Sequence, residues 1–434
     1  MFGFLKKQSP VRIIALGFMS LIFLGSALLM LPISVRDGVE MSYMDSLYMS
    51  TSAVCVTGLI TVDPYDTFTV FGQIVLGLLM QIGGLGVTSI GAGIILLVGK
   101  KIDLKGRNTV REAMNLENGK GVVRFIRSVF FTTVVIEFFG AALSFFVFIK
   151  DYPLQRAIGL SLFHSVASFN NSGFDLLGGM RSLSDYKSHV YLNIITCILI
   201  FLGGIGFLVI REVIAKKFKW KKFSMHTRVV LSMSATLIVA GTLFIKLSEG
   251  SEISWLGAFF TSNTARTAGF STYSFNSFSN AGLIVMLFLM IVGASPGSTG
   301  GGIKTSTLFV LLQGIKSAAT NRSEKAFHYS IPKEAFKKAA VIFLLALSII
   351  TAASFALAML EPDVPLRDVF FEMTSAFATV GLSTGITPEL SIGAKIVSCI
   401  VMYVGRLGPL TVASVWYFSR GERVSYPEGN ISIG

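Results

Sequence analysis

Four similar segments decide the fold of this chain, and the first reads SLYMSTSAVCVTGL at residues 46–59. The others read SLFHSVASFNNSGF at 161–174, GAFFTSNTARTAGF at 257–270 and VFFEMTSAFATVGL at 369–382. When they are aligned on their shared glycine, an aromatic column (Tyr48, Phe163, Phe259, Phe371) appears near the start of each segment. A hydroxyl column (Ser50, Ser165, Thr261) appears two residues later, with Met373 as the exception. The chain therefore contains a fourfold internal repeat.

The composition identifies an integral membrane protein. Of 434 residues, 52% are hydrophobic and 14% are charged, whereas a soluble domain carries about 25% charged residues. A bilayer core about 30 Å thick needs about 20 helical residues, and eight apolar runs have roughly that length or more. These runs are Val11–Leu31, Phe68–Val98, Val122–Ile149, Val190–Ile214, Val229–Leu247, Ala281–Ile315 (broken), Lys338–Leu360 and Ala394–Phe418.

Together, the runs and the segments predict an all-α integral membrane fold. We expect eight transmembrane helices, arranged as four helix–pore loop–helix repeats around one pore, like a potassium channel. The predicted repeats are 1–99, 100–217, 218–318 with an intramembrane loop at 294–304, and 319–434 with the C-terminal tail. One set of helix ends holds 26 of the 37 Lys and Arg residues, which predicts that both termini are cytoplasmic. The formal charge of +13 then reflects topology, and we expect no nucleic-acid partner.

Each repeated segment is too short to span the bilayer. Non-helical backbone survives at membrane depth only when it is buried in protein or lines a watery cavity. Four converging stretches can present rings of carbonyl oxygens that replace the hydration shell of a cation. Ordinary extracellular loops with turn glycines would explain four matched copies poorly. The candidate ion-binding residues of this selectivity filter are Val56, Thr57, Gly58, Asn171, Ser172, Gly173, Thr267, Ala268, Gly269, Thr379, Val380 and Gly381.

The sixth apolar run is interrupted by ASPGSTGGGIKTS at residues 294–306. Proline and clustered glycines cannot sustain a helix, so the span should open into a loop at mid-membrane. A nucleotide-binding loop requires Lys directly after the last glycine, but Ile303 intervenes. We therefore expect a flexible gate below the filter, made by Gly297, Ser298, Thr299, Gly300, Gly301, Gly302 and Lys304.

Equivalent glycines occur in the other repeats. For Gly83–Gly86 and Gly203–Gly206 we expect only kinks and close helix packing. The fourth repeat has Arg406 in this region, where a charge is costly unless it faces protein or water. Facing the pore, Arg406 would act as an electrostatic gate; the alternative is a structural ion pair with Glu137.

Two further polar residues in the segments are assigned structural roles. A single His164 without a carboxylate relay is expected to be a packing residue. Arg266 is expected to brace the third loop from behind. The three Cys and four His residues show no spacing typical of a disulfide or zinc site, so we predict no cofactor. No HExxH or Ser–His pattern is present, and the chain is not expected to be an enzyme.

The segments VCVTGL, NNSGFDL, TARTAGF and ATVGLSTG resemble the pore loops of the Trk/Ktr/HKT superfamily of potassium transporters. The compact length and the ending RVSYPEGNISIG are similar to the bacterial Ktr membrane subunit of the KtrB or KtrD type. This resemblance implies a K⁺-selective filter, because Gly58 stands where sodium-selective plant relatives have serine. It also implies an intramembrane gating loop, a homodimer in the bacterial plasma membrane, and a cytosolic RCK-type nucleotide-binding ring as regulatory partner.

The alternative function is a secondary carrier for an organic solute, built on broken helices at the membrane midplane. Such carriers usually show two inverted halves, whereas this chain shows four repeats in one direction. The sequence leaves Na⁺ dependence open, and also the choice between symporter and channel.

Overall fold

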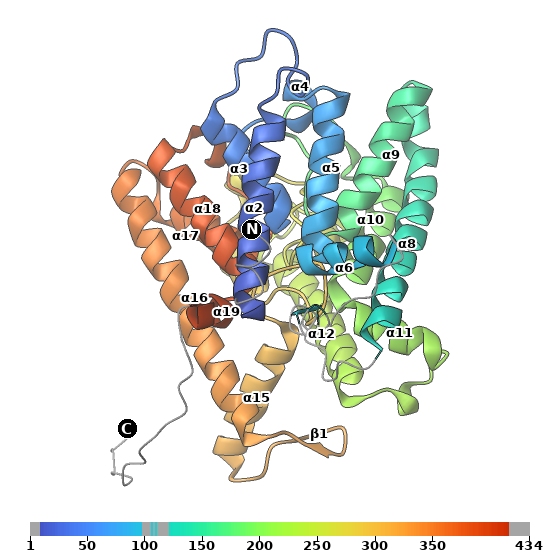
Figure 1. Cartoon of the computed structure of the whole chain (residues 1–434). Coiled ribbons are helices and arrows are strands. Elements are labelled where there is room, and N and C mark those ends of the chain that lie inside the picture. Colours follow the sequence, from blue (N-terminus) through green and yellow to red (C-terminus); the bar gives the residue numbers. More distant parts are fainter. Residues whose placement is uncertain (1–8, 98–105, 107–108, 111–120, 416–434) are drawn as a thin grey trace.

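The computed structural model describes residues 9–97, 106, 109–110 and 121–415, and these residues are almost entirely helical (Figure 1). The two chain ends, including the motif RVSYPEGNISIG, lie outside the described residues. One short hairpin, β1 (Lys325–Ala326) and β2 (Tyr329–Ser330), is the only sheet within the described part. The α-helices are α2 (Pro10–Leu29), α3 (Tyr43–Cys55), α4 (Pro64–Thr67), α5 (Val70–Leu85), α6 (Val87–Leu97), α8 (Val122–Asp151), α9 (Leu154–Phe169), α10 (Val190–Ile205), α11 (Phe207–Ala215), α12 (Met225–Glu249), α13 (Trp255–Thr264), α14 (Asn280–Ile291), α15 (Thr305–Thr320), α16 (Lys333–Leu360), α17 (Leu366–Ala378), α18 (Ile392–Leu407) and α19 (Pro409–Val415).

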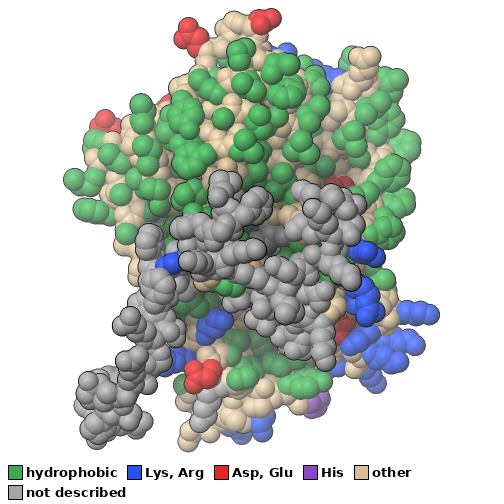
Figure 2. Space-filling view, viewed as in Figure 1, with side chains coloured by type: hydrophobic (Ala, Val, Ile, Leu, Met, Phe, Trp, Pro, Cys, Tyr) green, Lys and Arg blue, Asp and Glu red, His purple; other side chains and the backbone are tan. Residues whose placement is uncertain are grey.

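The same order of elements recurs four times: a long helix, a short helix, and a helix in two pieces. The long helices α2, α8, α12 and α16 each pack on the short helix that follows, namely α3, α9, α13 and α17. By length and composition, four described helices could cross a membrane: Pro10–Leu29, Val122–Asp151, Met225–Glu249 and Glu334–Leu360. A fifth is added if α10 and α11 are counted as one bent span. Figure 2 shows a broad hydrophobic surface over the upper part of the molecule. A count of eight spans remains a prediction.

Hydroxyl groups attach the short helices to the long ones. Ser50 Oγ donates to Ile22 O at 2.7 Å and Ser165 Oγ donates to Glu137 O at 2.7 Å. In the third repeat Ser262, rather than Thr261, makes this bond, at 2.9 Å to Ile238 O. Serine hydroxyls can satisfy carbonyls that a helix leaves accessible, so they fix close helix contacts in an apolar environment.

The third repeat is therefore offset by one residue from the predicted columns. Phe260 is fully buried, whereas Phe259 is 36% exposed. The helix α13 ends at Thr264, five residues before Gly269, while α3 ends only three residues before Gly58. The connection between helix and glycine is longer in this repeat, so alignment on the glycine misplaced the helical columns.

The second helices break more completely than the kinks expected at Gly83–Gly86 and Gly203–Gly206. Gly86, Gly206 and Gly408 have φ values of 84°, 89° and 87°, with ψ of 130°, 145° and 138°. These angles are nearly restricted to glycine and cannot continue a helix. The bend between α10 and α11 is 99°, and Figure 1 shows α6 lying across the lower end of α5.

The expected close packing is present at the preceding glycines. A Cβ added to Gly83, Gly203 or Gly405 would overlap a backbone carbonyl at the end of the short helix in the same repeat. These carbonyls belong to Val54, Phe169 and Phe377. Each occupies the position four residues before the repeated glycine, so the broken helix supports the filter segment directly.

Substitution of Gly206 by Ala should destabilise the protein by about 1–3 kcal/mol, the typical cost of a residue held in a forbidden backbone region. The added Cβ would also lie 2.6 Å from Pro296 O. Thermal unfolding of the full chain in detergent, followed by intrinsic fluorescence, measures the effect.

Gly159→Ala is the matched control, because Gly159 lies within α9 with nothing within 4 Å of an added Cβ. It should unfold at the same or a slightly higher temperature. Equal unfolding temperatures for Gly206→Ala and the wild type would contradict the requirement for this backbone conformation.

Candidate functional site: a ring of four glycine loops

The four repeated glycines meet in a closed ring. Their φ values are all positive, at 94°, 70°, 77° and 93° in chain order. A Cβ added to any of them would overlap the carbonyl oxygen of the residue before the glycine in the next repeat. The successive contacts are Gly58 with Ser172 O, Gly173 with Ala268 O, Gly269 with Val380 O, and Gly381 with Thr57 O. The order runs from the first repeat to the fourth and returns to the first, so four loops surround one axis.

Backbone amides near the glycines point back to their own short helices. Thr57 N donates to Ser52 O at 2.8 Å, Ser172 N donates to Ala167 O at 2.9 Å and Val380 N donates to Ser375 O at 3.0 Å. In the first and fourth loops the glycine amide is also held: Gly58 N bonds Ser52 Oγ at 3.0 Å, and Gly381 N bonds Ser375 Oγ at 3.1 Å. These bonds attach the loops to the ends of their own short helices.

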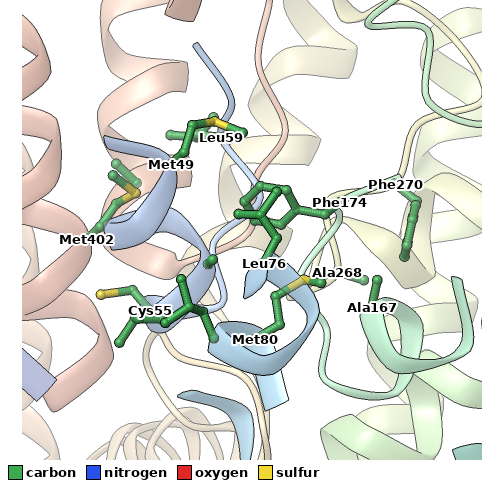
Figure 3. Packing of buried hydrophobic residues seen from close by; sticks show 14 of the residues in the cluster. Met49, Cys55, Leu59, Leu76, Met80, Ala167, Phe174, Ala268, Phe270 and Met402 are labelled. Atoms are coloured by element: carbon green, nitrogen blue, oxygen red, sulfur yellow. The ribbon is translucent and has the colours of Figure 1, made fainter. Parts of the chain in front are cut away.

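Apolar packing fixes the loops from the outside. The residue after each glycine is at most 1% exposed: Leu59, Phe174, Phe270 and Leu382. Figure 3 shows Leu59, Phe174 and Phe270 in the buried cluster together with Met80 and Ala268. This cluster draws side chains from all four repeats, so displacement of one loop would disturb the packing of the others.

All twelve predicted filter residues lie in or beside this ring. Eight of them have side chains with at most 2% exposure, namely Val56, Thr57, Asn171, Ser172, Thr267, Ala268, Thr379 and Val380. Of the four glycines, Gly58, Gly173 and Gly269 are buried and Gly381 is partly exposed. Three of the twelve residues form hydrogen bonds outside their own loops. Asn171 Oδ1 accepts from Thr267 Oγ1 at 3.0 Å, and Thr379 Oγ1 accepts from Gly301 N at 3.0 Å.

A cavity of about 270 Å³ opens on one side of the ring. The four glycines line it, together with the residues two positions later: Ile60, Asp175, Ser271 and Ser383. Asp175 is the only carboxylate among these lining residues; it is 9% exposed and its Oδ1 accepts from Leu177 N at 3.0 Å. Asp175 was given no role from the sequence, although it stands two residues after the repeated Gly173, within the motif NNSGFDL.

The loop at 294–304 lies against the other side of the ring. Asn171 Nδ2 donates to Thr299 Oγ1 at 2.8 Å, and Gly301 contacts Thr379 through the bond already described. A Cβ added to Gly300 would lie 2.7 Å from Thr267 Cγ2. The loop therefore touches the filter segments of the second, third and fourth repeats.

Backbone contacts give the loop a defined shape. Ser295 N donates to Gly204 O at 2.9 Å, and Phe207 N donates to Gly297 O at 3.0 Å. Lys304 Nζ donates to Gly300 O at 2.7 Å, which closes the loop on itself. The backbone break at Gly206, between α10 and α11, is thus the place where the loop is bound. The periodicity of apolar residues in the sequence could not assign this role to Gly206.

Arg406 joins this loop to two other repeats. Its guanidinium donates to the carbonyl oxygens of Thr299 and Gly83, and to Gly84 O at 3.2 Å. The alternative ion pair with Glu137 is not formed in the described structure. Glu137 instead accepts from Asn170 Nδ2 at 3.1 Å and from Gln81 Nε2 at 3.3 Å.

The structure also locates the two residues that were assigned structural roles. His164 Nε2 and Thr196 Oγ1 are 2.9 Å apart in a hydrogen bond, and the His164 ring packs on Phe148 and Phe270. Arg266 is 6% exposed and donates to Gly293 O and Ser234 Oγ, both at 3.4 Å. Arg266 thus lies behind the third filter segment and contacts the start of the 294–304 loop.

The chain resembles proteins of known family over nearly its whole length. A family model described as TrkH, cation transport protein, matches residues 7–237 and 229–417. The Potassium/sodium uptake protein NtpJ of Enterococcus hirae is 36% identical, with 99% of this chain and 98% of that protein covered. The Ktr system potassium uptake protein B of Bacillus subtilis is 35% identical, covering 99% and 97%.

A solved structure has the same fold. The potassium transporter TrkH from Vibrio parahaemolyticus matches with a TM-score of 0.74 and 19% sequence identity, covering 95% of this chain and 86% of that one. The family model and the full-length relatives establish the assignment: this chain belongs to the Trk/Ktr family of cation transport proteins, and is a membrane ion transporter rather than an enzyme.

Proposed function

We propose that the chain is a K⁺-selective, ion-translocating membrane subunit that mediates potassium uptake down the electrochemical gradient. The observation that carries this proposal is the closed ring of Gly58, Gly173, Gly269 and Gly381. One full-length relative is named a potassium uptake protein and another a potassium/sodium uptake protein, which agrees with potassium uptake. The organic-solute carrier is not favoured, because the ring encloses a single axis rather than a midplane solute site.

In this proposal the carbonyl groups around the ring replace water on a dehydrated cation. The filter consists of the three residues ending at each glycine, from Val56–Gly58 in the first repeat to Thr379–Gly381 in the fourth. An inside-negative potential of 100 mV supplies about 2.3 kcal/mol per charge, so uptake requires no nucleotide on this chain. Gly58, rather than serine, favours K⁺.

The gate in this proposal is the loop from Gly297 to Gly302, together with Lys304 and Arg406. The loop lies against three filter segments, where it obstructs the ion path, and the two cationic side chains raise the electrostatic barrier below the ring. Opening requires Thr299 to separate from Asn171 and from the Arg406 guanidinium.

We further propose the overall arrangement that the sequence predicted. The four repeats place eight spans around one pore in the bacterial plasma membrane, with both termini in the cytoplasm. The subunit forms a homodimer, and a cytosolic RCK-type ring regulates it. The short basic loops on the side of the termini supply a surface for that ring.

Substitution of Gly58 by Ser should lower the selectivity for K⁺ over Na⁺ by about tenfold, equivalent to about 1.4 kcal/mol. The new side chain would overlap Ser172 O and deform the ring. The measurement is ⁸⁶Rb⁺ uptake into liposomes that contain the purified chain, with K⁺ or Na⁺ as competitor. Gly159→Ala, in the exposed part of α9, is the control. Unchanged selectivity in a folded Gly58→Ser protein would rule out the ring as the filter.

Substitution of Arg406 by Gln should raise the initial rate of ⁸⁶Rb⁺ uptake severalfold. The change removes a positive charge from the ion path and weakens the bonds to Thr299 and Gly83. Lys395→Gln is a control on the same helix, because Lys395 pairs with Asp45 at 2.9 Å away from the loop. A rate below that of the wild type, with normal thermal stability, would indicate a structural role for Arg406.

Substitution of Asp175 by Asn should raise the Rb⁺ concentration that half-saturates uptake by about threefold, because a carboxylate at the mouth concentrates cations. The difference should shrink at high ionic strength. Asp185→Asn, which removes a charge that is 56% exposed and pairs with Arg181, should have little effect. Equal effects of the two substitutions would show that general surface charge, rather than Asp175, is responsible.

A further inference from the structure

We propose that residues 217–222 form a binding surface for anionic phospholipid headgroups. The sequence of this segment is Lys-Phe-Lys-Trp-Lys-Lys, and all six residues are exposed. Phe218 is 78% exposed and Trp220 is 44% exposed. The next residue, Phe223, is buried at 5% and attaches the segment to the protein.

The segment has a defined conformation. Lys217 and Phe218 have φ values of 49° and 57°, and two consecutive bulky residues in this region are held there only by surrounding contacts. Lys217 N donates to Ile214 O at 3.2 Å and Phe218 N donates to Val213 O at 3.1 Å. Residues Trp220–Lys222 then form a 3₁₀ turn, η2.

A set of hydrogen bonds around Glu212 fixes the two ends of the segment. The Glu212 carboxylate pairs with Lys216 and accepts from Thr227 Oγ1. It also accepts from Ser224 N at 2.9 Å and from Ser224 Oγ at 2.6 Å. Because Glu212 belongs to α11 and Thr227 to α12, the exposed segment projects from a rigid base.

Lysines at a helix end can be explained by topology alone, but topology does not explain the exposed aromatics. Trp220 makes edge contacts with Phe223 and Phe327 and still keeps 44% of its surface exposed, and Phe218 is more exposed than that. Phe218 and Trp220 alternate with lysines, so one short surface offers apolar rings and ammonium groups together. This combination suits the boundary between acyl chains and headgroups, where rings insert and lysines reach phosphate. Ile214, near the end of α11, is 62% exposed and extends the apolar surface.

The placement of the segment agrees with a membrane boundary. Figure 2 shows Lys and Arg side chains gathered at the lower right, below the hydrophobic surface. Figure 1 places α11 and the segment that follows it in this region. A charge-only surface for a soluble partner would not need two exposed rings, so we assign anionic lipid as the occupant.

Such a site would act on a helix that reaches the proposed gate. The helix α11 has nine residues, about 13 Å at 1.5 Å per residue. Its first residue, Phe207, donates to Gly297 O in the 294–304 loop. Bound lipid would therefore restrain one edge of the loop, a consequence that rests on the proposed function, whereas the binding itself does not.

Quenching of Trp220 fluorescence by brominated lipid tests the binding. The chain has three tryptophans, so Trp255→Phe and Trp416→Phe leave Trp220 as the only reporter in the full-length protein. The protein is reconstituted in mixed phosphatidylglycerol and phosphatidylcholine vesicles, with bromine on one lipid or the other at equal mole fraction. We expect stronger quenching by brominated phosphatidylglycerol, decreasing as salt is raised.

A charge-matched pair of variants identifies the residues responsible. Neutralising Lys217, Lys219, Lys221 and Lys222 to Gln should abolish the preference, because each lysine near an anionic surface contributes up to about fivefold. The control neutralises four exposed lysines elsewhere, Lys316, Lys325, Lys337 and Lys338, and should retain the preference.

Three outcomes would overturn the proposal. The first is equal quenching by the two lipids. The second is no quenching by either lipid, as expected for a surface in water or on a soluble partner. The third is an equal loss of the preference for phosphatidylglycerol in the two charge variants. The first two comparisons use unaltered lysines, so they hold even if the quadruple variant folds poorly. Uptake in the same vesicles then tests the link to the gate. Anionic lipid should change the wild-type rate but not that of the quadruple variant, and an equal lipid effect on both would refute the link alone.

Discussion

The close approach of four backbone loops is the constraint on which the rest of the structure depends. Each repeated glycine abuts the carbonyl of the next loop so closely that a single added carbon would not fit. In the proposed filter, carbonyl oxygens face one another across a narrow axis, where they would repel and, at membrane depth, lack bulk water. The ring therefore persists only because the surrounding helices hold it, and the fully buried aromatic and aliphatic residues behind it provide that support. Much of the geometry that the four repeats share therefore supports four short stretches of backbone.

The same constraint explains why glycine recurs below the ring. Gly83, Gly203 and Gly405 let the second helix of a repeat touch the carbonyl end of its short helix. Three residues later, Gly86, Gly206 and Gly408 have positive φ values that end the helix and change the direction of the chain. In the third repeat the corresponding residue is Pro296, and a whole loop replaces the single turn. Among the described residues, the third repeat therefore has a whole loop where the other three repeats have a single glycine turn.

The sequence was most informative where a physical requirement recurs. Gly58 and its three counterparts could be identified because four matched positions are improbable in ordinary loops, and Pro296 with its glycines because no helix tolerates them. The offset of Phe260 and Ser262 could not be predicted, since the number of residues between a helix end and a turn depends on tertiary packing. The bend at Gly206 was underestimated for a related reason: glycine permits both a kink and a full break, and only its contacts with the 294–304 loop decide between them. Asp175 was missed because the four segments were compared over the residues that precede the glycine, whereas Asp175 follows it.

The contacts of the 294–304 loop suggest how finely its position is balanced. Its described bonds to the ring and to Arg406 involve a few side chains, among them Asn171, Thr379 and Arg406. Each hydrogen bond contributes a net stabilisation of about 0.5–1.5 kcal/mol, so these bonds to the ring and to Arg406 contribute a few kcal/mol together, beside the backbone bonds that join the loop to Gly203, Gly204 and Phe207. Coupling energies of regulatory ligands are typically about 1–3 kcal/mol, and one charge moving through 100 mV gains about 2.3 kcal/mol. In the proposed gating, displacement of the loop requires its backbone bonds to Gly203, Gly204 and Phe207 to break or to move with it, whereas the ring above it is fixed by packing from all four repeats.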